Sequence, residues 1–248
     1  MEGIREVKLP RDSELLESFL MEDPVEFMPL ISDLRKERFP QAYAGISQGS
    51  ITTLVTIERE GRRVSIWAGD ARFVVPILGK WGPSKGALSV GLKHLHAVLE
   101  KYKPIRVFDE IFVMFVDKER FRFAPKHKAE RLTSEELPEP YPEDFKGIGY
   151  GIRVDNKVVS VGTVSNFVEG IGACGAAIGT DSEYRNRGYA TSTLSYAVRD
   201  ALNIVPIVTY PVESNNIPAI RVLEKLGFRF YSSFLYTEVE KRMDQKAS

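Results

Sequence analysis

Two arginines in a polar glycine turn are the residues whose spacing most directly indicates chemistry in this chain. Arg185, Arg187 and Gly188 follow the apolar residues 176–178. From Leu194 onward, apolar residues recur at the spacing of one helix face. The first turn of a helix leaves backbone N–H groups without partners and carries partial positive charge. A strand, a basic glycine turn and a helix in this order therefore predict a site for an anion such as a phosphate.

The glycine and the arginines have different parts in such a site. Gly188 has no Cβ, so a phosphate can approach the backbone closely, and each guanidinium can pair with phosphate oxygens through two hydrogen bonds. The spacing Arg185-x-x-Gly188-x-Ala190 matches neither the Walker phosphate loop nor the dinucleotide fingerprint GxGxxG. Taken alone, the pattern also fits an ordinary helix start with two solvated arginines.

A β-branched run at residues 204–210 predicts a buried strand after this helix. Pro206 lies near the start of the run and Pro211 just past its end. Proline cannot donate a hydrogen bond to a neighbouring strand, so we expect this strand to be unpaired on one side there.

A second helix with a defined start and end follows the strand. Asn216 is a favourable N-cap, and Gly227 is placed as the residue that ends the helix. Phe228 is positioned for the hydrophobic contact that often accompanies this kind of helix end. The apolar residues between them have the spacing of one helix face: Ala219, Val222, Leu223 and Leu226.

The two segments together resemble the cofactor-binding signatures of the GNAT (GCN5-related N-acetyltransferase) superfamily. Arg185 to Ala190 is similar to [R/Q]-x-x-G-x-[G/A], and Asn216 to Phe228 is similar to N-x-x-A-x-x-x-Y-x-x-x-G-F. The resemblance implies an α/β fold with a mixed sheet, the acyl-CoA N-acyltransferase fold. It also implies that the strands before and after the first helix splay apart, with the pantetheine arm of acetyl-CoA between them.

The resemblance assigns roles to individual residues. The backbone N–H of Ile178 would polarise the thioester carbonyl, and the backbone of Thr180 would contact the pantetheine. Asn216 would hydrogen-bond the pantetheine near the thioester, besides capping its helix. A continuous run would cradle the pyrophosphate: Arg185, Asn186, Arg187, Gly188, Tyr189 and Ala190.

One position departs from the family pattern. Leu223 stands where many members carry a tyrosine that is thought to protonate the departing CoA thiolate. Another group could supply the proton, namely Tyr210, Tyr231, Tyr236 or water, and we select Tyr236 as a candidate catalytic residue. Two alternatives stay open. In the first, no acid is needed, because a thiol pKa of about 8.5 makes the thiolate a tolerable leaving group. In the second, catalysis has been lost.

The resemblance implies direct transfer of an acetyl group from acetyl-CoA to an amine in a ternary complex. Holding the two reactants together can lower the barrier by about 7–11 kcal/mol at best. The amine must attack in its neutral form, so a base or a water chain must accept its proton. The carboxylates near the acyl end are Glu169, Glu183 and Glu213, and we select Glu213, just after the splayed strand. Each of them also fits a solvated surface carboxylate.

Composition limits the partners and the compartment. The 248 residues include 34 Lys and Arg against 34 Asp and Glu, which argues against binding nucleic acid through bulk charge. A single cysteine, Cys174, allows neither an intrachain disulfide nor a cysteine metal cluster, and we expect no metal. The sequence has no apolar run of transmembrane length and no signal-peptide profile, so we expect a cytoplasmic protein that does not bind membranes.

A proline-rich acidic stretch divides the sequence. We expect an additional N-terminal α+β domain at 1–130, a linker at 131–145 and the GNAT domain at 146–248. Because tandem GNAT proteins carry a degenerate unit before the working one, the N-terminal domain could be such a unit. Within it we predict a turn at Glu60-Gly61, a strand at 72–78 and a helix from Leu88 to about Lys103, among other elements.

Two functions of different classes fit these observations. The first is an N-acyltransferase that uses acetyl-CoA and an unidentified amine acceptor, either a small molecule or a protein amine. The alternative is a non-catalytic CoA-binding sensor or interaction module, which Leu223 and the extra N-terminal part favour. A nucleotide-binding protein of another fold would need a phosphate-binding lysine or a magnesium ligand in the turn, and neither is evident. The sequence leaves open whether the chain forms a homodimer.

Overall fold

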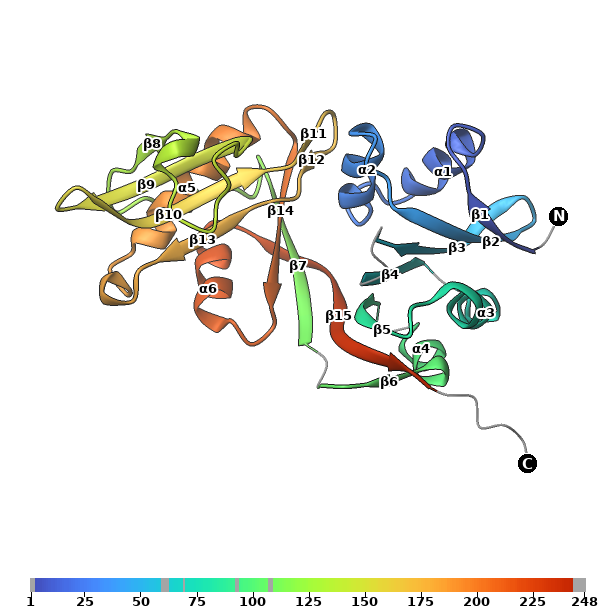
Figure 1. The fold of residues 1–248 in the computed structure, drawn as a ribbon. Coiled ribbons are helices and arrows are strands. Elements are labelled where there is room, and N and C mark those ends of the chain that lie inside the picture. The colour runs from blue at the N-terminus through green and yellow to red at the C-terminus, as the bar shows by residue number, and fades with distance from the viewer. Residues whose placement is uncertain (1–2, 59–62, 69, 92–93, 107–108, 243–248) are drawn as a thin grey trace. The chain divides into compact units, whose positions relative to one another are not determined.

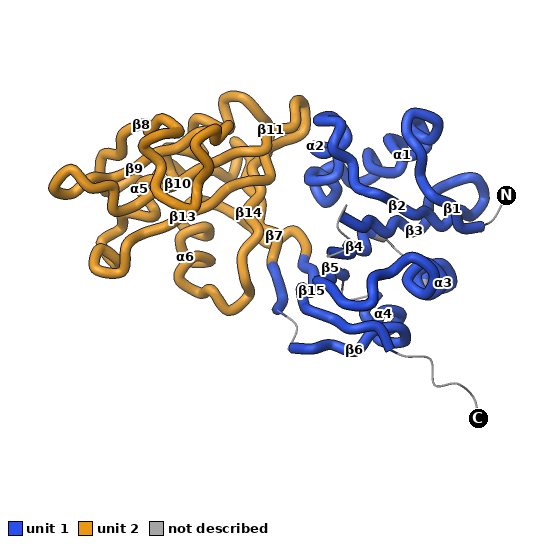
Figure 2. Tube along the Cα trace, viewed as in Figure 1, with its two compact units in different colours: residues 1–111, 233–248 blue, residues 112–232 orange. Residues whose placement is uncertain are grey.

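The computed structural model describes residues 3–58, 63–68, 70–91, 94–106 and 109–242. The chain forms two compact units, unit 1 with residues 1–111 and 233–248, and unit 2 with residues 112–232 (Figure 2). Six α-helices and a mixed arrangement of strands among the described residues confirm the predicted α/β class (Figure 1). No helix in the described ranges is long and apolar enough to cross a membrane.

Unit 1 is a mixed sheet with four helices. The strands run in the order β1-β2-β3-β4-β5-β15, and β6 also pairs with β15. The pair β4–β5 is parallel, and the other recorded pairs are antiparallel. Its elements are β1 (Gly3–Val7), α1 (Ser13–Leu20), α2 (Met28–Arg35), β2 (Gln41–Ser47), β3 (Ser50–Ile57), β4 (Arg63–Ala68), α3 (Ala71–Trp81), β5 (Lys85–Val90), α4 (Leu95–Lys101), β6 (Tyr102–Pro104) and most of β15 (Arg229–Lys241).

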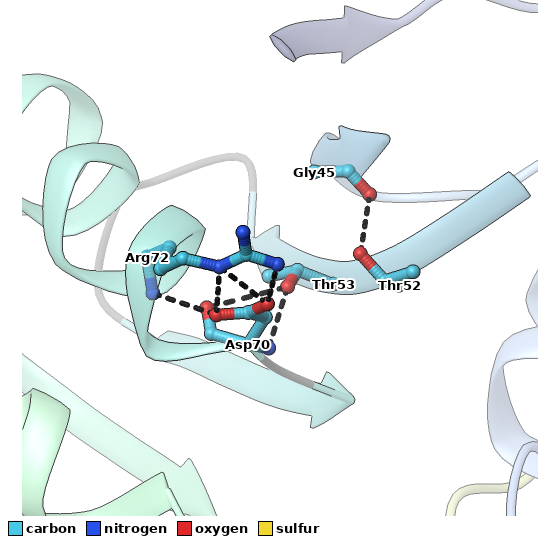
Figure 3. A network of polar contacts seen from close by, with 5 residues as sticks. All are labelled: Gly45, Thr52, Thr53, Asp70 and Arg72. Atoms are coloured by element: carbon cyan, nitrogen blue, oxygen red, sulfur yellow. Dashed lines mark hydrogen bonds and ion pairs between the residues drawn. The ribbon is translucent and has the colours of Figure 1, made fainter. Parts of the chain in front are cut away.

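Residues 72–78 form part of helix α3, so the predicted strand is wrong. The carboxylate of Asp70 accepts a hydrogen bond from the backbone N–H of Arg72 at 2.9 Å and caps the helix. The Thr53 hydroxyl in turn accepts from the N–H of Asp70 at 2.8 Å, as Figure 3 shows. This anchored cap favours a helix although the segment is rich in β-branched residues. Helical spacing then buries one face: Val74, Ile77 and Leu78.

The predicted single helix from Leu88 to about Lys103 is also wrong. The segment begins within strand β5, continues with helix α4 and ends in strand β6. Leu88 and Val90 are fully buried two residues apart, which is the period of a strand. Residues 92–93 and the predicted turn at Glu60-Gly61 lie outside the described residues.

Unit 2 combines two groups of strands with two α-helices. One is an antiparallel sheet in the order β13-β10-β9-β8, and the other contains β7-β14-β12-β11. The start of β15 lies beside β7, since Phe112 packs against Phe230 and Phe115 against Tyr231. The elements are β7 (Asp109–Asp117), β8 (Glu130–Leu132), β9 (Gly147–Val154), β10 (Lys157–Ser165), β11 (Phe167–Val168), β12 (Gly172–Ala173), β13 (Ala177–Thr180), α5 (Tyr189–Leu202), β14 (Ile207–Glu213) and α6 (Ile217–Lys225).

Helix α5 packs closely on β10, which fixes the position of its N-terminus. A Cβ on Gly162 would lie 2.4 Å from the backbone nitrogen of Leu194, so only glycine allows this approach. The apolar face that the sequence predicted is confirmed, because its four residues are completely buried: Leu194, Ala197, Val198 and Ala201.

The predicted linker at 131–145 lies inside unit 2. It contains the end of β8 and a short 3-10 helix, Ser134–Glu136, which Thr133 and Glu136 close with a capping box. Apolar residues of this segment pack with Val161 of β10 and explain why the segment belongs to the unit: Leu132, Leu137, Tyr141 and Phe145. The compact units therefore divide at other positions than the predicted domains, and β7 and β15 each contribute to both units.

Candidate active site

Two strands of unit 2 start side by side and then diverge. β12 pairs with β14 in parallel, joining Ala173 to Val208. A few residues later the chain continues as β13, which pairs with β10 in the other sheet. The predicted splay is therefore present. β14 has β7 on one side and β12 on the other, and its recorded pair with β12 is at Val208, between the two prolines at which we expect an unpaired side. Pro211 lies inside β14 rather than past its end.

A hydrogen bond joins the diverging strands. The backbone N–H of Ile178 on β13 donates to the hydroxyl oxygen of Tyr210 on β14, with 3.2 Å between the atoms. Burial raises the pKa of Tyr210, and the Ile178 N–H opposes that shift only in part. Tyr141, whose hydroxyl lies 3.3 Å from that of Thr163, adds to the rise of the Tyr210 pKa. The Ile178 N–H, which we predict to polarise a thioester, therefore donates its hydrogen bond to the protonated phenol of Tyr210.

The basic turn between β13 and α5 has the backbone that its sequence predicts. Asn186 and Gly188 adopt left-handed φ angles of 63° and 83°, conformations that asparagine and glycine tolerate best. Gly188 is the N-cap of α5, so the helix begins at Tyr189. The N–H groups of the first turn are thereby presented beside the basic residues.

The two arginines of the turn are exposed, and each donates a hydrogen bond to a backbone carbonyl of its own loop. Arg185 Nε donates to the carbonyl of Thr180 at 3.3 Å, and Arg187 Nη2 to that of Glu183 at 3.1 Å. The Arg187 guanidinium also lies 5.2 Å from the ring centroid of Tyr184. These contacts keep both guanidinium groups at the N-terminal end of α5.

A basic segment at 126–128, which was not predicted from the sequence, lies beside the turn. The Ser192 hydroxyl accepts from the N–H groups of Lys126 and His127 at 3.0 and 3.1 Å and donates to the Gly188 carbonyl at 3.0 Å. Nε2 of His127 donates to the Arg187 carbonyl at 2.9 Å. The run Lys-His-Lys was a visible signal of charge, but nothing local in the sequence connects it to the turn.

The electrostatics of this region favour an anion. Three exposed cationic side chains lie near the positive end of α5, Lys126, Arg185 and Arg187, and a fourth exposed cation, Lys128, is two positions after Lys126 in the sequence. Within the described ranges, none of these four forms an ion pair with a carboxylate. Nearby, Asp181 is paired with Lys157 at 2.7 Å. The arrangement can bind a phosphate or pyrophosphate without first breaking an ion pair of those four.

Helix α6 has the start and the end that the sequence predicts. Asn216 Oδ1 accepts from the backbone N–H of Ala219 at 3.2 Å, so the asparagine is the N-cap. Gly227 has a φ of 94°, and the Phe228 N–H donates to the Leu223 carbonyl at 3.0 Å, which completes a Schellman motif. Leu223 and Phe228 are completely buried. The side chain at 223 therefore faces the hydrophobic core.

The two predicted catalytic residues lie in different units. Glu213 is exposed at the end of β14, three positions after Tyr210. Tyr236 lies on β15 within unit 1, where the guanidinium groups of Arg63 and Arg106 are 5.5 and 5.8 Å from its ring centroid. The remaining predicted site residues, including Thr180 and Asn216, belong to unit 2 together with Glu213.

A comparison with protein families agrees with this geometry. The model described as acetyltransferase (GNAT) domain matches residues 102–229, which is more than half of the chain. The chain belongs to the GNAT acetyltransferase family. The GNAT match includes the basic turn, both helices of unit 2, strand β14, the segment 126–128 and the predicted linker.

Several solved structures, among them GNAT proteins, resemble nearly the whole chain. A Drosophila protein of 15% sequence identity has a TM-score of 0.66, covering 98% of this chain and 99% of its own. A tandem GNAT protein from the clavulanic acid biosynthesis pathway, 11% identical, has a TM-score of 0.59 with coverage of 97% and 98%. A GCN5-related N-acetyltransferase from Sphaerobacter thermophilus, 12% identical, has a TM-score of 0.59 with coverage of 96% and 95%. No curated protein matches the sequence.

Among the residues that the structure describes, no three His, Cys, Asp or Glu side chains gather in a group that could hold a metal ion. The candidate site brings together backbone N–H groups, cationic side chains and the hydroxyl of Tyr210.

Proposed function

We propose that this chain transfers an acetyl group from acetyl-CoA to an amine by direct attack in a ternary complex. The observation that carries the proposal is the basic turn at the N-terminus of α5, directly after a strand that diverges from β14. An anion site beside two diverging strands suits a ligand with a pyrophosphate and a long flexible arm. The family of the chain is one of acetyltransferases.

The cofactor would be held along unit 2 by the predicted residues. The backbone of Thr180 and the side-chain NH₂ of Asn216 would contact the pantetheine, since the Asn216 oxygen already caps α6. Ile178 would lie beside the thioester. The pyrophosphate would meet the helix start and its turn: Arg185, Asn186, Arg187, Gly188, Tyr189 and Ala190.

Few reactive side chains are needed for this reaction, because orientation of the two reactants supplies much of the acceleration. Glu213 is our proposed base for the amine proton, since it is exposed at the end of β14. Tyr236 remains our predicted acid for protonating the departing CoA thiolate. The acceptor is an amine of a small molecule or of a protein. We place the reaction in the cytoplasm, because a single cysteine fits a reducing compartment.

The test is release of CoA from acetyl-CoA over a broad panel of amines, compared between wild type and Arg185→Glu. The proposal expects release that depends on one class of amine and is strongly reduced in the variant. Binding of acetyl-CoA without release for any amine would support the non-catalytic CoA-binding module instead. The specific observation that favours this second candidate is Leu223, which is buried where many GNAT members have a tyrosine.

A further inference from the structure

A buried phenol holds the backbone N–H that would polarise the thioester. Ile178 N–H donates to Tyr210 Oη at 3.2 Å, and Tyr210 is only 8% exposed. A tyrosine hydroxyl accepts through its lone pairs and still has one proton to donate. The hydrogen bond from Ile178 uses the acceptor side of Tyr210 and leaves the O–H proton for another partner.

That proton has no acceptor in the described part of the chain. The neighbouring hydroxyl of Tyr141 is itself 3.3 Å from the Thr163 hydroxyl. The Tyr210 hydroxyl therefore has one partner, the Ile178 N–H, and its proton is available to a further acceptor such as the carbonyl oxygen of a ligand. The hydroxyl lies between the diverging strands β13 and β14, where the acyl end of the cofactor is proposed to lie.

The electrostatic surroundings keep Tyr210 in the form that can donate. Burial raises its pKa and the nearby Tyr141 adds to the rise, while the Ile178 N–H lowers it in part. The phenol therefore carries its proton at neutral pH. A hydrogen bond received at the oxygen also polarises the O–H and strengthens it as a donor.

We infer that the Tyr210 hydroxyl, rather than the Ile178 N–H, donates the hydrogen bond to the carbonyl oxygen of the bound thioester. The inference rests on the proposed function and specifies the group that stabilises its transition state. In the reaction, the amine nitrogen forms a bond to the carbonyl carbon and the C=O π pair moves onto oxygen. When that pair returns, the C–S bond breaks and its electrons leave on sulfur.

The proton balance does not require Tyr210 to ionise. The amine loses one proton through water or a base, and the CoA thiolate gains one, so the products are an amide and free CoA. Tyr210 keeps its proton and stabilises the negative charge on oxygen through the hydrogen bond. Its role thus differs from that of the family tyrosine at position 223, where this chain has a buried leucine.

The test uses acetyl-CoA labelled with carbon-13 at the thioester carbonyl and infrared difference spectroscopy of the bound ligand. In wild type, the hydrogen bond should lower the carbonyl stretching frequency below its value in free acetyl-CoA. In Tyr210→Phe the band should return toward the free value while calorimetry still detects binding. Tyr150→Phe is a matched control, because Tyr150 is also 8% exposed in unit 2 but donates to Asp200, and its band should equal that of wild type.

An unchanged band in Tyr210→Phe would overturn the inference. A band at lower frequency would do the same, because it would mean that the released Ile178 N–H is the better donor. If Tyr210→Phe fails to fold, 3-fluorotyrosine can be placed at position 210, because it keeps the ring and makes the hydroxyl a stronger hydrogen-bond donor. The carbonyl band should then lie at a lower frequency than in wild type. An unchanged band would contradict the inference. Failure of wild type to bind acetyl-CoA would overturn the proposed function, and the inference with it.

Discussion

The imidazole of His127 hydrogen-bonds to the backbone carbonyl of Arg187, with 2.9 Å between Nε2 and the oxygen. Nε2 carries the proton, because a carbonyl oxygen can only accept. The same ring meets the ring of Tyr189 edge-on, with 4.8 Å between centroids. One side chain therefore contacts both residues that flank Gly188, and it holds the turn in the shape that an anion would meet.

Replacing His127 by alanine should weaken binding of acetyl-CoA. The loss of one hydrogen bond, worth about 0.5–1.5 kcal/mol, corresponds to an affinity about 2- to 12-fold lower if it loosens the turn. Titration calorimetry measures the change. His96→Ala is the control, since its side chain is 92% exposed in unit 1, and it should bind as wild type does. Equal affinity of His127→Ala and wild type would show that the contact does not shape the site.

Leu223 should behave as a core residue and not as a catalytic position. Leu223→Ala should lower the free energy of unfolding by about 2–5 kcal/mol, because the side chain is completely buried. Leu223→Tyr, which restores the family residue, should overpack the core, lower stability by about 1–3 kcal/mol and leave CoA release no faster. Denaturant unfolding and a CoA-release assay measure both effects. Faster release by the tyrosine variant would contradict this account.

Asp200 should contribute stability that is lost in acid. Burial raises the pKa of this carboxyl, but hydrogen bonds from Tyr150 at 2.6 Å and Arg199 at 2.8 Å outweigh burial, so the pKa lies below its ordinary value. A group whose folded pKa is depressed stabilises the protein above its unfolded pKa of about 3.9. That contribution disappears as the pH falls through the lower folded pKa.

The measurement for Asp200 is the free energy of unfolding between neutral pH and about pH 3, for wild type and Asp200→Asn. The variant should be less stable at neutral pH, and the difference between the two proteins should shrink toward the acid end of the range. A difference that stays constant down to the lowest pH would mean that Asp200 is not held by these partners.

Features of the site that depend on neighbouring residues could be predicted from the sequence. The Schellman end of α6 requires only Gly227 and an apolar residue after it, and the apolar face of α5 follows from its spacing. The left-handed turn at Gly188 is similarly local. These features carry the resemblance to the GNAT family, which explains why the turn and both helices were found.

Features that depend on distant contacts could not be predicted in this way. His127 and Arg187 are 60 positions apart, and no local pattern connects them. Helix α3 forms from a segment with strand-like composition because Thr53 anchors the Asp70 cap from another element. The segment 131–145 looks like a linker by its prolines, yet its apolar side chains pack on β10. In each case a tertiary contact overrides the local preference.

The most direct test of the central claim is thermal unfolding with and without acetyl-CoA, for wild type and Arg185→Glu. Arg221→Glu, an exposed site on α6 with the same charge change, is the matched control. At a hundredfold excess over Kd, binding to the native state should stabilise by about 2.7 kcal/mol and raise Tm by roughly 5–10 °C. We predict this rise in wild type and Arg221→Glu, and its loss in Arg185→Glu. No rise in wild type at a saturating dose would contradict an acetyl-CoA site at the basic turn.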